Sequence, residues 1–340
     1  MSSGIDSSFR NYLKLIKHAQ KDPNGVVNLY LFSNSQYDMY SDILSGKLLL
    51  DFTKQIEFTI KTSKKVKIYF IVHWPGWAPL AIELKNKLKG LLIYDCMDHH
   101  FGFSNVNPLI ERDEIDLLKE SDFVSTTSQL LQDKARKYNN NCAMIQNATD
   151  YFHFNDSPPN GELGFLIDYP IIGYHGAIND WFDFELMERC SQRYTDYNFV
   201  LIGGTDHPDF VSFRNRLAKF RNIHLLGEIP YHSLPGYIAY FNVCLIPFKI
   251  NQLTNSTNPV KFYEYLSTGK PIVTVNLPEL EPFKDYCYWS RDSDEFTDNI
   301  EIALNEQEKD IKSGNRKRLA QENTWDIRFN NFKSLIEKLS

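Results

Sequence analysis

Short apolar runs alternate with segments of helical periodicity along most of this chain. The runs that we expect to form strands cover residues 26–32, 66–72, 91–97, 123–127 and 142–146, and then 171–175, 199–203, 223–226, 243–247 and 271–275. Between them lie segments with apolar residues at helical spacing, such as Phe210, Phe213 and Leu217. Strands that alternate with helices are typical of parallel sheets covered by helices, so the pattern predicts an α/β fold.

The two sets of runs are separated by NDSPPNGELG at 155–164, which is rich in proline, glycine and asparagine. We therefore predict two doubly wound domains, residues 1–158 and residues 159–340, and 340 residues are enough for two cores. Two such sheets would bind ligands at the carboxyl ends of their strands, in a cleft between the domains. The tail carries five apolar residues at helical spacing, which predicts an amphipathic helix: Trp325, Phe329, Phe332, Ile336 and Leu339.

Composition excludes several classes of protein. No apolar run approaches the ~20 residues that cross a bilayer, and the first residues do not form a signal peptide. The five cysteines are scattered and form no CxxC pair, so we expect free thiols in a reducing compartment instead of a disulfide framework or a zinc site. These features predict a cytoplasmic protein.

The charge is distributed unevenly. The first 92 residues contain 13 Lys and Arg against 7 Asp and Glu, although the whole chain has a net charge of -6. The basic part, which includes KTSKKVK at 61–67, is either a solvated face or a surface attracted to the inner face of the membrane, where the protein would associate peripherally. Nucleic acid is not an expected partner, because the chain is acidic overall and carries no known nucleic-acid-binding motif.

The segment NPVKFYEYLSTGKPIV at 258–273 combines a helix start, a cation and a carboxylate. Asn258 is a suitable N-cap and Pro259 suits the first helical position, which leaves the amides of Val260 and Lys261 free to bind an anion. Lys261 adds a positive charge, and Glu264 follows one turn later on the same face. The segment therefore predicts a nucleotide site, with the diphosphate at the helix start and the ribose at Glu264. The alternative is an ordinary amphipathic helix that leads into a core strand.

Several segments, in order, resemble glycosyltransferase family 4. IYDCMDHHFGF at 93–103 is similar to the YDCMDDHxGF segment of one bacterial subgroup, and IIGYHGAINDWFDFELM at 171–187 resembles the opening of the donor domain. NIHLLGEIPYHSLPGYI, NPVKFYEYLSTGKPIV and ENTWDIRFNNF follow in the family's order. The resemblance covers roughly residues 70–340. It implies the GT-B fold, with two Rossmann-like domains, an interdomain cleft and a C-terminal helix that packs back across the domains.

The resemblance also implies a function. A glycosyltransferase of this kind transfers a sugar from a nucleotide sugar, which we expect to be a UDP-sugar, to a glycan or a lipid-linked acceptor in the synthesis of cell-surface polysaccharide or glycoconjugate. It implies retention of anomeric configuration and a reaction that needs no bound metal or other cofactor. DCMD at 95–98 could instead be read as a metal-binding pair, but polar caps at a strand end explain it equally well.

The implied donor site contains turns and a helix start. Besides the residues of 258–264 already named, it includes Gly176, Ala177, Gly203, Gly204, Gly227 and Ile229. Two departures from the family pattern matter: Ser256 stands where the first of two glutamates is expected, and Ala177 stands in the place of an arginine. Lys261 therefore becomes the leading candidate for neutralising the diphosphate, helped by the amides of Gly176 and Ala177.

The implied acceptor side follows two predicted strands of the first domain. Asp98, His99 and His100 follow the run 91–97, where a histidine or aspartate can accept a proton near neutral pH. His99 departs from the subgroup's aspartate, so we prefer Asp98 and His100. Trp74 and Trp77, in HWPGW, suit contact with sugar rings, and the alternative is a tryptophan-rich corner of the core.

Two other functions remain open for this sequence. A sugar-nucleotide epimerase of the same fold would act on the donor without an acceptor. A degenerate, non-catalytic partner subunit would explain the missing glutamate at position 256 and the missing arginine at position 177. A dehydrogenase is disfavoured, because no GxGxxG motif opens either predicted domain.

Overall fold

The computed structural model describes residues 30–33, 36–61, 67–103, 106–204, 211–307 and 312–339. These residues form two compact units. Unit 1 contains the described residues up to 126 together with 132–143 and 339, and unit 2 contains 127–131 and the described residues of 144–338. The predicted domain boundary after residue 158 lies inside unit 2 and stays a prediction.

Unit 1 is built on a four-stranded sheet. Its strands, in spatial order, are β1 (Tyr69–Val72), β2 (Leu91–Cys96), β3 (Phe123–Thr126) and β4 (Cys142–Met144). Its helices are α2 (Gly46–Lys61), η1 (Pro75–Trp77), α3 (Ala78–Leu88), η2 (His100–Gly102), α4 (Ile110–Glu120) and α5 (Gln129–Arg136), the first turn of which belongs to unit 2. The strands β1, β2 and β3 run parallel, and α3 packs against β1, β2, α2 and α4. The centre of β2 is apolar because helices cover such a sheet, and Leu92 and Ile93 are fully buried.

Unit 2 is built on a six-stranded parallel sheet. In spatial order its strands are β10 (Tyr288–Ser290), β9 (Ile272–Val275), β8 (Val243–Ile246), β5 (Ile171–His175), β6 (Asn198–Ile202) and β7 (Ile223–Gly227). The chain winds outward from β5 in one direction and from β8 in the other. The strand order therefore reverses between β5 and β8, and ligands bind at the carboxyl ends of the strands at such a switch point.

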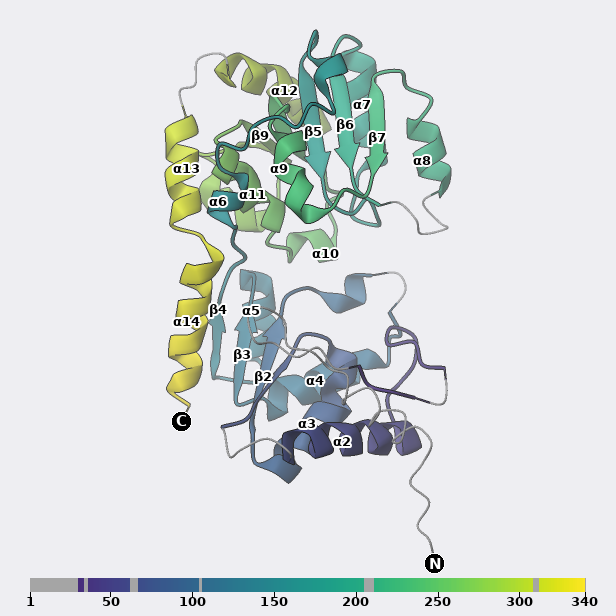
Figure 1. The fold of residues 1–340 in the computed structure, drawn as a ribbon, viewed down its shortest axis with the longest axis vertical. Helices are drawn as coiled ribbons and strands as arrows, with labels where there is room; N and C mark the ends of the chain where they lie inside the picture. Colours follow the sequence, from purple (N-terminus) through teal and green to yellow (C-terminus); the bar gives the residue numbers. More distant parts are fainter. Residues whose placement is uncertain are drawn as a thin grey trace, which may run out of the picture. The chain divides into compact units, whose positions relative to one another are not determined.

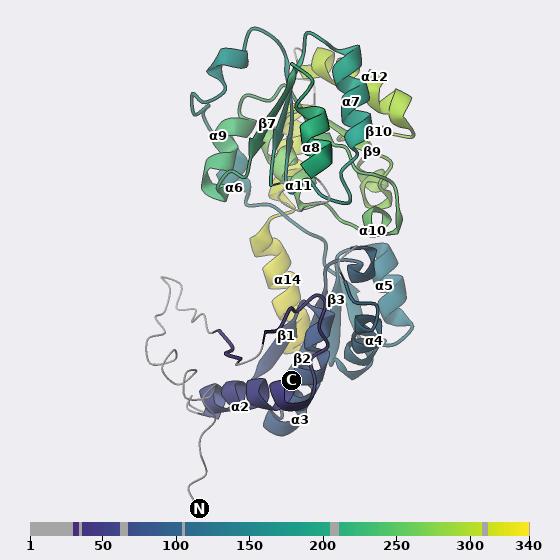
Figure 2. The same ribbon diagram turned by 90° about the vertical axis from the view of Figure 1, so that its right-hand side faces the viewer.

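Helices cover both faces of the sheet of unit 2. The helices of unit 2 are α6 (Tyr151–Phe154), η3 (Gly164–Leu166), α7 (Phe184–Arg193), α8 (Val211–Leu217), η5 (Tyr231–Ser233), α9 (Leu234–Ile238), α10 (Gln252–Asn255), α11 (Val260–Thr268), η6 (Pro278–Phe283), α12 (Ser293–Gln307), α13 (Ser313–Gln321) and α14 (Trp325–Glu337). The two views show α6 and α9 on one face and α7 and α12 on the other (Figures 1 and 2). α11 packs against α6 and α13, which fixes its orientation at the switch point.

Most strands lie where the apolar runs predict them. The strand β5 has the predicted bounds, and α14 covers most of the predicted amphipathic tail, with Thr324 as its N-cap. Of the predicted strand 26–32, residues 26–29 lie outside the described residues, and the three that are described form no strand. The five cysteines are free thiols, as predicted. Within the described ranges, none of the helices has the length and apolar character that a membrane span requires.

Candidate functional site

The start of α11 and the turn after β5 meet in unit 2. A Cβ atom placed on Gly176 would lie 2.9 Å from Cε of Lys261 and 3.3 Å from its Nζ, so the lysine side chain lies directly against the turn. The backbone of Gly176 has a φ of +128°, which disfavours a side chain there. The Lys261 ammonium also lies 4.6 Å from the ring centroid of Phe248 and 5.4 Å from that of Tyr174. The structure therefore brings together the predicted cation and the predicted turn.

Glu264 adds a buried carboxyl group one turn along α11. Its side chain is largely buried, and Oε2 lies 3.3 Å from Nε2 of His175. Burial raises the pKa of Glu264 to about 7, although the charge of Lys261 opposes this shift. Burial also lowers the pKa of Lys261 to about 8, and the charge of Glu264 opposes that shift. Both groups therefore change charge near neutral pH, where an incoming anion or hydroxyl group can alter their protonation.

His175 is a residue of this site that the sequence reasoning missed. It is the last residue of β5, it is buried, and its backbone amide donates a hydrogen bond of 2.9 Å to the hydroxyl of Tyr265. Burial and the charge of Lys261 lower its pKa to about 3, so the imidazole is neutral at physiological pH. The available signal was its position, because it ends a predicted strand immediately before the turn.

Three glycine turns pack against one another at the ends of β5, β6 and β7. The amide of Gly203 donates to the carbonyl of Gly227 over 2.7 Å, and the amide of Gly176 donates to the carbonyl of Ile202 over 2.9 Å. The Gly176 amide is therefore not free for a ligand, which corrects that part of the prediction. The hydrogen-bond donor left at this turn is the amide of Ala177, which donates to no group of the described residues.

A pocket of about 320 Å³ opens beside these turns. It is lined by Ile178, Gly203, Gly204, Arg214, Leu225, Leu226, Gly227 and Glu228. Three of the predicted glycines are thus brought to one pocket, whereas Ile229 is not one of its lining residues. Arg214, an exposed residue of α8, was not predicted, because nothing in the sequence of α8 links it to the glycine turns.

Gly203→Ala should destabilise unit 2 and weaken ligand binding. Gly203 has a φ of +154°, and an added Cβ would lie 1.9 Å from the carbonyl oxygen of Gly176, so backbone must move. We expect a loss of about 2–3 kcal/mol in the free energy of unfolding, measured by urea denaturation. Gly161→Ala is the matched control, because Gly161 also has a positive φ, +89°, but an added Cβ meets no atom within 4 Å. Equal losses in both variants would contradict a specific clash.

The start of α11 differs in one respect from the prediction. The helix begins at Val260 with Pro259 in the N-cap position, and no side chain caps it. Asn258 does not act as the N-cap, because its side chain is buried and used elsewhere: Oδ1 accepts from the amide of Asn147 over 2.9 Å, and Nδ2 donates to the hydroxyl of Tyr263 over 3.2 Å. The amides of Val260 and Lys261 donate to no group within the described part of the chain, so both predicted anion-binding donors are in place.

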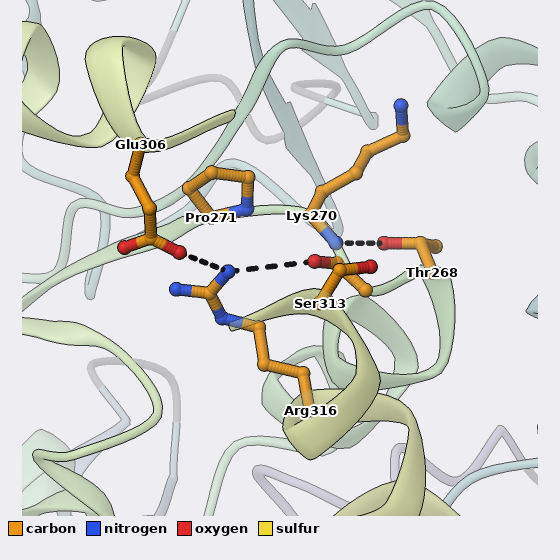
Figure 3. A pocket seen from close by; sticks show the side chains of 7 residues that line it. Thr268, Lys270, Pro271, Glu306, Ser313 and Arg316 are labelled. Carbon is orange, nitrogen blue, oxygen red and sulfur yellow. Dashed lines mark hydrogen bonds and ion pairs between the residues drawn. The ribbon is translucent and has the colours of Figure 1, made fainter. Parts of the chain in front are cut away.

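A second small pocket lies at the other end of α11. It has a volume of about 210 Å³ and contains Arg316, whose side chain is 1% exposed. Figure 3 shows the Arg316 guanidinium and the Glu306 carboxylate pointing toward one another, with Nη1 and Oε1 2.8 Å apart. Nε of Arg316 donates to the carbonyl of Tyr286 over 2.7 Å. This cluster ties α13 to the end of α12, and we interpret it as structural because the charge of Arg316 is already paired.

The predicted acceptor residues of unit 1 lie beyond the end of β2. His100 is buried, and its ring meets that of Trp74 edge-on at 5.1 Å between centroids. Burial lowers the pKa of His100 to about 4, although a hydrogen bond to the backbone of His73 opposes the shift. Burial lowers the pKa of His99 and raises that of Asp98. His100 is therefore a neutral, enclosed imidazole, and its role as proton acceptor stays a prediction.

The two tryptophans of HWPGW lie among other rings of unit 1. Trp74 is buried, and its indole N–H donates to the carbonyl of Met39 over 3.0 Å. Trp77 packs against Tyr37 and Phe52 at centroid distances of 6.0 and 6.1 Å. These contacts fit the alternative of a tryptophan-rich corner of the core, and a part for either indole in acceptor binding stays a prediction.

Among the described residues, no group of three or more His, Cys, Asp and Glu side chains has an arrangement that would hold a metal ion. That the reaction needs no metal stays a prediction.

Comparison with known proteins finds a family match for the part of the chain that holds the turn and α11. Residues 170–306 match the sequence profile of the family described as glycosyl transferases group 1. This segment of the chain is therefore similar to the glycosyl transferases of group 1. The recognition of a family 4-like glycosyltransferase from the sequence is therefore confirmed. The chain is also 23% identical over 257 residues to the putative teichuronic acid biosynthesis glycosyltransferase TuaH of Bacillus subtilis (strain 168). The match covers 70% of this chain and 64% of that relative, so the chain spans less than two thirds of the relative's length.

Solved structures agree on the fold of this glycosyltransferase-like chain. Sucrose-phosphate synthase from Thermosynechococcus elongatus superimposes with a TM-score of 0.71 at 15% identity, over 86% of this chain and 78% of that one. HepE from Anabaena, solved in complex with UDP and glucose, gives a TM-score of 0.68 at 14% identity, over 87% and 84% of the two chains. The prediction of a GT-B protein with two Rossmann-like domains is confirmed. The interdomain cleft and the packing of the last helix across the domains stay predictions.

Proposed function

We propose that this protein is a glycosyltransferase that transfers a sugar from a UDP-sugar to a glycan or lipid-linked acceptor in the synthesis of a cell-surface polysaccharide. The observation that carries the proposal is the Lys261 ammonium held against the Gly176 turn, with Glu264 one turn further along α11. The profile match covers this part of the chain. HepE is described in complex with UDP-glucose, and TuaH is described as a teichuronic acid biosynthesis enzyme, which supports the choice of nucleotide and pathway class.

Each group of the donor site has a chemical task in this proposal. Lys261 and the amides of Val260, Lys261 and Ala177 bind the diphosphate and stabilise its charge as it leaves. The Glu264 carboxylate accepts hydrogen bonds from the ribose hydroxyls. The glycine turns at Gly203 allow the nucleotide to approach the backbone closely. The nucleobase would then lie in the pocket beside these turns, and Ile229 follows its lining residue Glu228 in the sequence.

The finer parts of the proposal come from the family resemblance. They are retention of configuration, transfer without a bound metal, and a cytoplasmic location with peripheral association at the inner face of the membrane. Asp98 and His100, with His99, Trp74 and Trp77, would form the acceptor side. Unlike the donor residues, these groups are supported by position alone, because they follow two strands at the carboxyl edge of a sheet.

Calorimetry with UDP tests the donor site, and UDP release from UDP-sugars tests the reaction. At a UDP concentration of 100 times Kd, binding to the native state should add roughly 2.7 kcal/mol to the free energy of unfolding. A protein that neither binds UDP nor gains stability from it would contradict the proposal.

A non-catalytic partner subunit is the second candidate. Ser256 occupies the place of the family's first glutamate, it is buried, and its hydroxyl donates to the carbonyl of Gln252 over 2.8 Å. Binding of UDP without release from any UDP-sugar would favour this candidate. Turnover of a UDP-sugar into its epimer in the absence of acceptor would favour an epimerase.

The affinity for UDP should be highest between about pH 7 and pH 8. The pKa of Lys261 is lowered to about 8, so above that pH the free protein loses the cation and Kd should rise by up to tenfold per pH unit. The pKa of Glu264 is raised to about 7, so below that pH the carboxyl becomes neutral and accepts hydrogen bonds less well. Calorimetry from pH 6 to 9 measures the rise of Kd on the acidic side and on the alkaline side of this range. In Lys261→Met the rise of Kd above pH 8 should disappear. If it persists, Lys261 is not the cation that binds UDP.

A further inference from the structure

One nitrogen of the His175 ring lacks a hydrogen-bond partner in unit 2. This atom, Nε2, is buried, and none of the described residues forms a hydrogen bond with it. It lies 3.3 Å from Oε2 of Glu264, and the two side chains are only 6% and 8% exposed. An unpartnered polar atom inside a protein reduces the free energy of unfolding, so a buried histidine of this kind is expected to serve some purpose other than stability.

Three elements of unit 2 hold the imidazole in place. His175 is the last residue of β5, and its backbone amide donates to the hydroxyl of Tyr265 on α11. The ring of Tyr265 meets the imidazole edge-on at 4.9 Å between centroids, and the ring of Phe154 on α6 lies nearly parallel to it at 6.3 Å. Both of these rings are buried. The imidazole therefore has little freedom to turn, and Nε2 stays beside the carboxyl group of Glu264.

The charge state of the imidazole decides what Nε2 can do. His175 is neutral at physiological pH, because burial and the charge of Lys261 lower its pKa to about 3. A neutral imidazole carries one ring proton, and a proton on Nε2 can be donated to the carboxylate of Glu264. The separation of 3.3 Å is slightly longer than an ordinary N–H···O hydrogen bond. Such contacts are often long in a ligand-free site and shorten in the complex, so a small movement of the carboxylate would complete the bond.

We propose that His175 is a positioning residue, which donates a hydrogen bond from Nε2 to Glu264 and so holds the carboxylate in place for the ribose hydroxyls of the nucleotide. The inference rests on the proposed function, because it adds a residue to that same donor site. All the groups involved belong to unit 2. Without this task an apolar side chain would suit the position better, because it would bury no polar atom between the rings of Phe154 and Tyr265.

The test compares His175→Leu and His175→Gln with the unaltered chain by calorimetry. The two probes are UDP and 2′,3′-dideoxy-UDP, which lacks both ribose hydroxyls. Leucine cannot donate a hydrogen bond, so the Kd for UDP should rise about 10- to 100-fold in His175→Leu, whereas the Kd for the dideoxy analogue should stay within about twofold. The side-chain amide of glutamine is a donor, so His175→Gln should recover most of the affinity for UDP. His232→Leu, at an exposed histidine of unit 2, is the control and should change neither Kd.

Two further measurements separate this role from a structural one. With a UDP-sugar that the parent chain turns over, KM should rise in His175→Leu while kcat stays within about twofold, because the ribose is bound equally in the ground state and the transition state. The urea concentration at half-unfolding should stay equal or rise, because leucine buries no polar atom.

The outcomes distinguish the inference from the proposed function. An unchanged Kd for UDP in His175→Leu would overturn the inference. Equal losses of affinity for UDP and the dideoxy analogue would also overturn it, because they indicate a general distortion of the site. A parent chain that does not bind UDP, or that binds both probes equally well, would instead overturn the proposed donor site, and this inference with it.

Discussion

Lys261→Met should lower kcat/KM for the nucleotide sugar by about 10²- to 10³-fold and weaken UDP binding, the largest functional effect that we expect. The ammonium is the cation that lies against the Gly176 turn, and no arginine stands at Ala177 to replace it. The free energy of unfolding should stay equal or rise. Burial disfavours the charged form of this lysine, and a methionine fits the apolar surroundings of Phe248 and Tyr174.

The measurement combines steady-state kinetics, calorimetry with UDP and urea denaturation. Lys284→Met is the matched control, because Lys284 is an exposed lysine of the same unit, and we expect it to change neither affinity nor rate. If Lys261→Met binds UDP as well as the parent chain, the diphosphate does not bind at the start of α11. If it binds UDP weakly but also unfolds at lower urea, the loss of affinity would be structural.

Arg316→Met should reduce the free energy of unfolding by about 3 kcal/mol, the largest effect on stability that we expect. The substitution leaves the Glu306 carboxylate with the phenolic hydroxyl of Tyr288 and with Lys312, whose Nζ is 3.7 Å away. These partners place the loss at the lower end of the range for a broken buried ion pair. Thermal and urea denaturation measure it.

Two further variants distinguish a buried pair from ordinary surface charge. Lys312→Met should change stability by at most about 1 kcal/mol, because its side chain is 38% exposed and its ion pair is long. The double variant Arg316→Met with Glu306→Gln should recover part of the loss, because no unpaired buried charge remains. A single Arg316→Met variant as stable as Lys312→Met would show that the pair contributes little.

The fold could be predicted where strands are continuously buried. The strand β5 appears in the sequence as five residues between Pro170 and Gly176, and all five are buried. The edge strand β10 was missed, because it has three residues and only Ser290 is buried, so no apolar run marks it. The resemblance to the family supplied the order of the segments, and the strand order in space then follows from doubly wound topology.

The sequence predicts those parts of the candidate site that depend on neighbouring residues of the chain, and it misses those that depend on contacts between distant residues. Lys261 and Gly176 meet as expected, because a helix start and a strand end are both local features. The N-cap prediction was wrong because Asn258 bonds to Asn147, a partner 111 residues away. The carbonyl that accepts a hydrogen bond from the Gly176 amide belongs to Ile202 on the neighbouring strand. The contact of His175 with Glu264 likewise joins a strand end to a helix that follows much later in the chain, which a single sequence does not specify.

The hydrogen bonds between the segment 147–149 and α11 have a consequence for dividing the protein into fragments. Asn147 donates to the backbone carbonyl of Asn258, and the hydroxyls of Thr149 and Ser267 lie 3.1 Å apart and share a hydrogen bond. A recombinant fragment that starts at residue 159 would contain α11 but lose both partners. A fragment that starts at residue 144 would keep them, so the smallest nucleotide-binding piece worth expressing begins before the proline-rich segment.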